Sequence, residues 1–120
     1  MAYTAYVLTE RSRRNVLIAY PPKFPVVRAH HVTLQFGVPR DTVAPTPARI
    51  EVIGYAHDDS LEALVVTVNS KCKRDDGSVY HITLSHAEGR KPVESNAVIA
   101  ANGWRMSGPY GLETVPEVLK

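Results

Sequence analysis

Cysteine is almost absent from this sequence, because Cys72 is the only one among 120 residues. A disulfide within the chain is therefore impossible, and no C-x-x-C pair is present that could begin a zinc site. A single free thiol favours a reducing compartment, so we expect a soluble cytoplasmic protein. No apolar stretch approaches the length of a membrane span, and the N-terminus lacks the pattern of a signal peptide.

The sequence also lacks a large excess of either positive or negative charge. Fourteen basic and twelve acidic residues leave a formal net charge of +2, with an isoelectric point near 8.8. A protein that coats long nucleic acid is usually more basic, whereas this balance permits a small anionic ligand. Hydrophobic residues make up 44% of the chain, which is ordinary for a globular protein, and we expect one domain over residues 1–120 with one core.

The apolar and turn-forming residues predict more strands than helices. A helix over about 10–20 would be capped by Thr9 and ended by Pro21-Pro22, and a second over 92–101 would end at Gly103. Strands are expected over 3–9, 27–37, 49–56, 61–69 and 78–86, with a last strand from 104–106 and 110–115. The proline-rich stretch 38–48 predicts a long loop.

This order of elements predicts the fold class. One helix lies near each end of the chain, and the strands between them are joined by turns rather than by helical crossovers. We therefore expect an α+β domain with a largely antiparallel sheet and two helices packed on it.

A short pattern occurs twice, at 31–34 (His-Val-Thr-Leu) and at 81–84 (His-Ile-Thr-Leu). Both copies lie in expected strands, where alternate side chains share a face. In the first strand one face would carry His31, Thr33 and Gln35, opposite an apolar face that includes Phe36.

The second copy repeats this arrangement, with His81, Thr83 and Ser85 on one face and apolar residues on the other. Two such strands side by side would place two imidazoles and two hydroxyls around one small anion. Buried polar side chains need hydrogen-bond partners. A binding site would explain why polar residues lie on these strand faces.

The chemistry of these residue types points to phosphoryl transfer. Histidine titrates near neutrality, so two imidazoles can divide general base and general acid catalysis between them. The hydroxyls of Thr33 and Thr83 could donate to non-bridging oxygens as charge develops there. Nothing in this scheme requires a metal or another cofactor.

Paired His-x-Thr-x motifs on strands resemble those of the two-histidine phosphoesterases, the LigT-like superfamily. The resemblance implies a pseudo-twofold, two-lobed fold whose motif strands line a central groove. It also implies catalytic roles for His31 and His81 and phosphate binding by Thr33 and Thr83. Family members include cyclic phosphodiesterases of RNA ends and enzymes that cut cyclic oligonucleotide signals.

We therefore expect a metal-independent phosphodiesterase that acts on an RNA-type, cyclic-phosphate or cyclic-oligonucleotide phosphodiester. Its partner would be a small nucleotide or an RNA end, without a membrane or an obligate protein partner. One alternative is a non-catalytic nucleotide- or RNA-binding module that uses the same groove. Another is a structural or interaction domain in which the two motifs are coincidental.

The remaining histidines and aromatic residues are assigned to structural positions. In a regular strand His30 would face away from His31, and His57 and His86 would lie at the surface. No H-x₃-H spacing supports a zinc site made from these histidines and Cys72. The charged segment 71–77 is typical of a solvated hairpin tip. Four aromatic side chains could stack on a base but are expected in the core: Tyr6, Tyr20, Trp104 and Tyr110.

Overall fold

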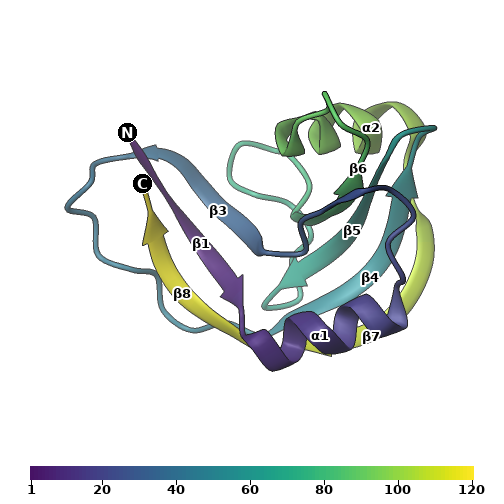
Figure 1. The fold of residues 1–120 in the computed structure, drawn as a ribbon. Helices are drawn as coiled ribbons and strands as arrows, with labels where there is room; N and C mark the ends of the chain where they lie inside the picture. Colours follow the sequence, from purple (N-terminus) through teal and green to yellow (C-terminus); the bar gives the residue numbers. More distant parts are fainter.

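The computed structural model describes all residues, 1–120, and shows two antiparallel sheets with two α-helices (Figure 1). Strands β3, β1 and β8 form a three-stranded sheet in that order, and β2, β6, β5, β4 and β7 form a five-stranded sheet. The elements are β1 (Ala2–Leu8), α1 (Glu10–Ala19), β2 (Val26–Val27), β3 (His31–Val38), β4 (Ile50–His57), β5 (Leu61–Val68), β6 (His81–His86), a 3₁₀ turn η1 (Pro92–Glu94), α2 (Ser95–Asn102), β7 (Arg105–Leu112) and β8 (Thr114–Leu119). The expected α+β class with antiparallel pairing and packed helices is confirmed, although the strands form two sheets rather than one.

Helix α1 forms where the sequence predicts it. The Thr9 hydroxyl accepts a hydrogen bond from the backbone N–H of Ser12, so it caps the first turn. Val16 is fully buried in the main core, whereas Arg11 and Arg14 face solvent. The helix thus packs one apolar stripe against the strands.

Helix α2 differs from its prediction. The segment begins with the 3₁₀ turn at Pro92, so the α-helix itself starts only at Ser95. Because a 3₁₀ turn has three residues per turn, the helix is rotated relative to a continuous one. Ser95, Val98 and Ile99 are its buried residues. Neither α-helix is long and apolar enough to cross a membrane.

The C-terminal strands connect the two sheets. β7 pairs with β4 in the five-stranded sheet, and β8 pairs with β1 in the three-stranded sheet. Glu113 lies between them, where its carboxylate accepts from Arg11 at 2.6 Å and its N–H donates to Ser12 Oγ. The start of α1 is therefore fixed to the point where the two sheets meet.

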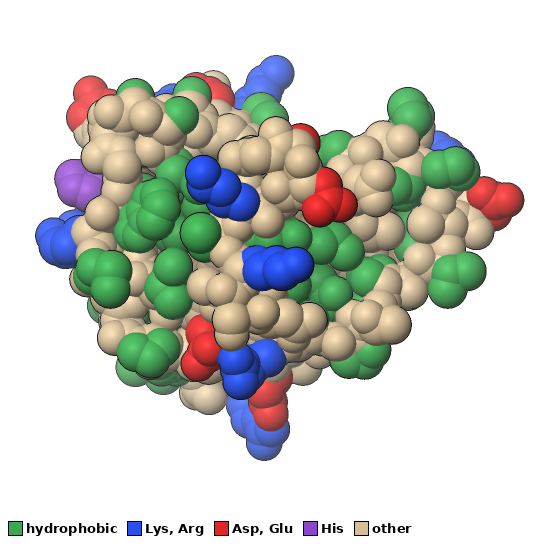
Figure 2. All heavy atoms as spheres, turned by 180° about the vertical axis from the view of Figure 1, so that it is seen from behind, with side chains coloured by type: hydrophobic (Ala, Val, Ile, Leu, Met, Phe, Trp, Pro, Cys, Tyr) green, Lys and Arg blue, Asp and Glu red, His purple; other side chains and the backbone are tan.

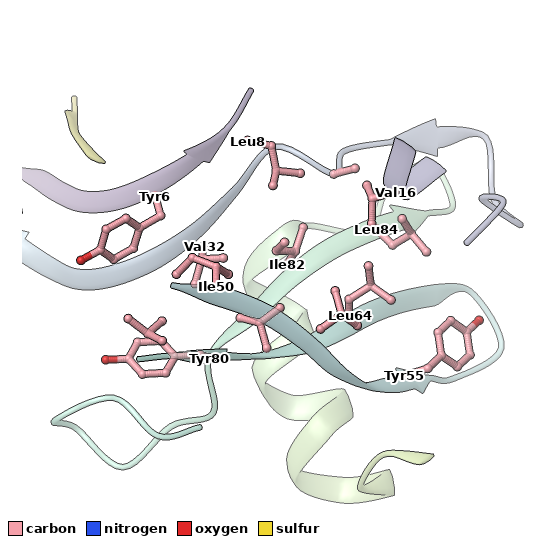
Figure 3. Packing of buried hydrophobic residues seen from close by; sticks show 14 residues of the cluster. Tyr6, Leu8, Val16, Val32, Ile50, Tyr55, Leu64, Tyr80, Ile82 and Leu84 are labelled. Carbon is pink, nitrogen blue, oxygen red and sulfur yellow. The ribbon is translucent and has the colours of Figure 1, made fainter. Parts of the chain in front are cut away.

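One hydrophobic cluster joins both sheets. Strand β5 is buried along its whole length, and Leu64 lies at its centre. Val32 from β3 and Ile82 from β6 contribute to the same cluster of 14 buried residues (Figure 3). These two side chains are the residues that follow the motif histidines, so each motif strand turns its apolar face into this core.

Charged side chains of both signs are scattered over the face opposite to that of Figure 1 (Figure 2). Basic and acidic groups alternate there without a large region of one sign. This distribution matches the small net charge of the chain. A concentration of positive charge is found instead in one cavity.

Candidate functional site

The two motifs meet in a cavity of about 520 Å³. His31 and Thr33 reach it from β3 of one sheet, and His81 and Thr83 reach it from β6 of the other. The structure thus brings all four predicted site residues together, although their strands are not hydrogen-bonded to each other. The lining residues are Tyr3, Arg28, His30, His31, Thr33, Phe36, Arg74, His81, Thr83, Pro92, Val93 and Asn96.

The charge of this lining is one-sided. Arg28 and Arg74 contribute two guanidinium groups, three histidines add titratable nitrogens, and no aspartate or glutamate is present. Cationic donors in a lining that contains no carboxylate form a favourable environment for an anion. The cavity is therefore suited to a phosphate or another small oxyanion.

A β-bulge in β3 shapes the first half of the site. Thr33 and Gln35 pair with consecutive residues of β1, so Leu34 is an extra residue in the strand. The alternation of side chains changes at this point, and Phe36 rather than Gln35 lines the cavity. The prediction that Gln35 shares the face of His31 is therefore wrong, because it assumed a regular strand.

Strand β6 has a bulge at the equivalent place. Thr83 and Ser85 pair with consecutive residues of β5, so Leu84 is the extra residue. Ser85 is fully buried and its hydroxyl donates to the Glu62 carboxylate, outside the cavity. The expected position of Ser85 beside Thr83 is also wrong, for the same reason.

A hydrogen bond to the backbone orients the His81 ring. Its Nδ1 lies 2.9 Å from the carbonyl oxygen of Val79. A carbonyl only accepts, so Nδ1 carries the hydrogen and donates it. In the neutral ring Nε2 therefore has the lone pair and is the atom available for proton transfer.

The His31 ring is oriented by another histidine. The Nδ1 atoms of His30 and His31 lie 2.9 Å apart, so one of them donates a hydrogen to the other. His30 thus lines the cavity beside His31, contrary to the expectation that it faces away. The expectation failed because His30 precedes β3 and follows Ala29, whose φ of 47° interrupts the extended backbone.

The surroundings of both motif imidazoles lower their pKa values and so favour the neutral rings at neutral pH. Burial, followed by the neighbouring charges of His30, His81 and Arg74, lowers the pKa of His31 to about 4. Burial and Arg74 also lower the pKa of His81, against the opposing effect of the Val79 carbonyl. An anion between these groups would oppose the lowering of the pKa by the neighbouring positive charges, and so help one ring to take up a proton.

The two threonines are not equivalent. The Thr83 hydroxyl lies 3.1 Å from the Pro92 carbonyl oxygen and 2.8 Å from Ser95 Oγ. Since the carbonyl can only accept, the hydroxyl hydrogen of Thr83 is directed at Pro92, away from a ligand. The Thr33 hydroxyl makes no such bond within the protein and can donate into the cavity.

Sequence reasoning missed the two arginines of the site. Arg28 lies in the connection between β2 and β3, and its Nε donates to Nε2 of His86 at 3.1 Å. His86 is 2% exposed, so the expectation of a surface histidine is wrong, whereas His57 is exposed as expected. Arg74 belongs to the segment 71–77, where only a solvated tip was expected. No motif marks either arginine, and only the pairing of distant segments reveals them.

The aromatic residues of the cavity also differ from those considered. Tyr3 and Phe36 form one wall, with ring centroids 5.3 Å apart, and Phe36 is 54% exposed. Tyr20 and Tyr110 pack edge to face against each other instead, as expected for structural residues. No group of three or more histidine, cysteine, aspartate or glutamate side chains is arranged to hold a metal ion.

Comparisons with protein-family models, with curated protein sequences and with solved structures find no match. The function must therefore be argued from the geometry and the charges of this cavity.

The low pKa of His31 has a consequence for folding. Between the unfolded value of 6.5 and about 4, the unfolded chain binds a proton that the folded protein does not. The free energy of unfolding therefore falls as the pH is lowered through this window, and His81 acts in the same direction. We expect the midpoint temperature of thermal unfolding to decrease as the pH is lowered from 6.5 to about 4. In His31→Gln this decrease should be less steep.

The matched control is His57→Gln, which removes an exposed histidine outside the cavity. Its midpoint temperature should depend on pH as steeply as that of wild type. Carboxylates with lowered pKa values, such as Asp58 and Glu113, reduce the free energy of unfolding mainly below about pH 4.5. Equal slopes for both variants and wild type would show that His31 is not held neutral.

Proposed function

We propose that the protein is a metal-independent phosphodiesterase in which His31 and His81 exchange protons with the reacting oxygens. The observation that carries the proposal is the meeting of both His-x-Thr pairs in one acid-free cavity with two arginines. Within this proposal the two motif strands are related by the pseudo-twofold arrangement of the LigT-like family. The equivalent bulges at Leu34 and Leu84 support that relation.

In the proposed reaction one imidazole accepts a proton at Nε2 from a hydroxyl or water oxygen. That oxygen forms a bond to phosphorus while the bond to the leaving oxygen breaks. The second imidazole, protonated when the anion binds, donates its Nε2 hydrogen to the leaving oxygen. Val79 and His30 support these steps, because each accepts or shares the Nδ1 hydrogen of one ring.

The cavity also supports a nucleotide as the substrate. The wall of Tyr3 and Phe36 offers an apolar surface next to the cationic groups, which suits a base attached to a phosphate. The proposed substrate is an RNA end with a cyclic phosphate, or a short or cyclic oligonucleotide. The proposed compartment is the cytoplasm, where the single free Cys72 would stay reduced.

The experiment is incubation of the protein with 2′,3′-cyclic nucleotides, 2′-5′-linked and 3′-5′-linked dinucleotides and cyclic oligonucleotides. We expect cleavage of at least one of them. A preparation of the double variant His31→Ala with His81→Ala serves as the control for contaminating nucleases. Thermal stabilisation by a nucleotide without turnover would favour the binding module, and neither effect would favour a structural domain.

Proton transfer by two histidines also predicts the response to chelation. We expect the rate on the responsive substrate to be unchanged in saturating EDTA, because no step of the proposed reaction uses a Lewis acid. The measurement is the initial rate before and after dialysis against EDTA. Loss of the rate, with recovery on adding zinc or manganese, would contradict the mechanism.

A further inference from the structure

Arg74 is a buried cation without an acidic partner. The residue is only 7% exposed, and none of the ion pairs of the structure includes it. Its Nε is buried and has no hydrogen-bond acceptor. The guanidinium lies over the ring of Phe36, 5.6 Å from the centroid, at the wall of the cavity.

The backbone holds Arg74 in this position. Its N–H donates to the Ser78 carbonyl at 2.8 Å, and its own carbonyl accepts from Gly77 at 3.0 Å. A bridge between Lys73 and Val79 closes the same turn just before β6. The side chain therefore enters the cavity from a closed turn next to His81.

An unpaired buried charge is costly for the folded state. Burial lowers the pKa of Arg74, with Asp76 and Tyr80 opposing, but a guanidinium remains charged at physiological pH. Arg90 shows the usual solution, because it pairs with Asp58 at 3.0 Å and with Glu94 at 2.9 Å. Arg74 lacks such partners and faces a cavity lined by no aspartate or glutamate, so an anion bound there would supply its counter-charge.

We propose that Arg74 binds the phosphoryl group in this cavity and takes the role that the motif pattern alone assigns to Thr83. Thr83 directs its hydroxyl hydrogen at the Pro92 carbonyl, so it has none to offer a ligand. The pair of donors at the phosphate is then Thr33 and Arg74, one from each side of the cavity. The participation of Arg74 in turnover rests on the proposed function, whereas its binding of an anion does not.

The first test measures anion binding without any substrate. Inorganic phosphate is titrated into wild type and into Arg74→Met, and binding is followed by calorimetry and by the C2–H resonances of the histidines. A charge-assisted hydrogen bond supports about 10- to 100-fold in affinity, so we expect a loss of this size in Arg74→Met. Trimethyl phosphate, an uncharged probe of similar shape, should not bind either protein.

The second test uses the stability of the protein in phosphate-free buffer. Removal of an unpaired buried charge should raise the unfolding midpoint of Arg74→Met in phosphate-free buffer, even though binding is lost. Lys73→Met is the matched control, because it removes the same charge from an exposed neighbour in the same turn. It should leave both the midpoint and the phosphate affinity near the wild-type values.

Other results would overturn the proposal in ways that separate it from the enzyme. Phosphate affinity retained in Arg74→Met, or in Arg74→Gln if the methionine variant does not fold, would show that Arg74 is not the anion ligand. Phosphate binding that depends on Arg74, without turnover of any substrate, would keep this inference and remove the phosphodiesterase. Turnover that is unchanged in Arg74→Met would keep the phosphodiesterase and remove the role of Arg74 at the phosphoryl group.

Discussion

His31→Ala and His81→Ala should each abolish most of the turnover on a responsive substrate. General acid or base catalysis contributes roughly 10²- to 10⁴-fold to a rate, and each variant loses one of these functions. The double variant should be scarcely slower than either single one, because the two rings act in the same step. Initial rates at saturating substrate, with circular dichroism to establish folding, provide the measurement.

Matched variants distinguish this result from a general loss of structure. Thr33→Val keeps the shape of the side chain and removes one donor, so its rate should fall less than that of either histidine variant. His57→Ala removes an exposed histidine outside the cavity and should have no effect. A histidine variant that retains nearly the full rate would falsify the paired-histidine mechanism.

Glu62→Ala should be the most destabilising single substitution at the polar groups of the core. Glu62 is 1% exposed and accepts from Tyr55 Oη at 2.6 Å and from the N–H of Lys23 at 2.8 Å. The hydroxyl of Ser85 donates to the same carboxylate. Truncation would leave these donors buried without an acceptor, at a cost of about 3–5 kcal/mol. Urea unfolding of the purified variant measures the loss.

Two controls bracket this prediction. Glu117→Ala removes an exposed carboxylate on β8 and should change the free energy of unfolding by no more than about 0.5 kcal/mol. Glu62→Gln keeps the volume but presents an amide donor to groups that are themselves donors, so its loss should be intermediate. A loss in Glu62→Ala no greater than that in Glu117→Ala would contradict the buried network.

The sequence predicts the elements of this protein better than their details. Periodic apolar residues and the caps at Thr9 and Gly103 are local signals, so the helix α1 and the end of α2 are close to their expected bounds. Strand 27–37 divides into β2 and β3 because Ala29 adopts a positive φ, which no turn residue announces. The expected last strand, 104–106 and 110–115, becomes two strands: β7 pairs with β4 on both sides of an unpaired stretch at 107–109, and β8 pairs with β1.

The site illustrates the same division between local and long-range information. His31 and His81 are found from a repeated tetrapeptide, and the cavity contains both. The expected places of Gln35 and Ser85 fail at the two bulges, which arise from register between strands rather than from composition. Arg74 is missed because an isolated arginine in a charged turn has no pattern of its own. Burial and the absence of a partner are visible only in three dimensions.

The pairing of β1 with β8 places the two ends of the chain next to each other, since Tyr3 is opposite Leu119 (Figure 1). Antiparallel neighbours lie about 5 Å apart, so a linker of a few residues is long enough to close the chain into a circle. New ends can then be opened in the loop between β3 and β4, residues 39–49, which contains no strand or helix. Such a circular permutant would leave both motif strands intact, and the same geometry would allow the whole domain to be inserted into an exposed loop of a host protein.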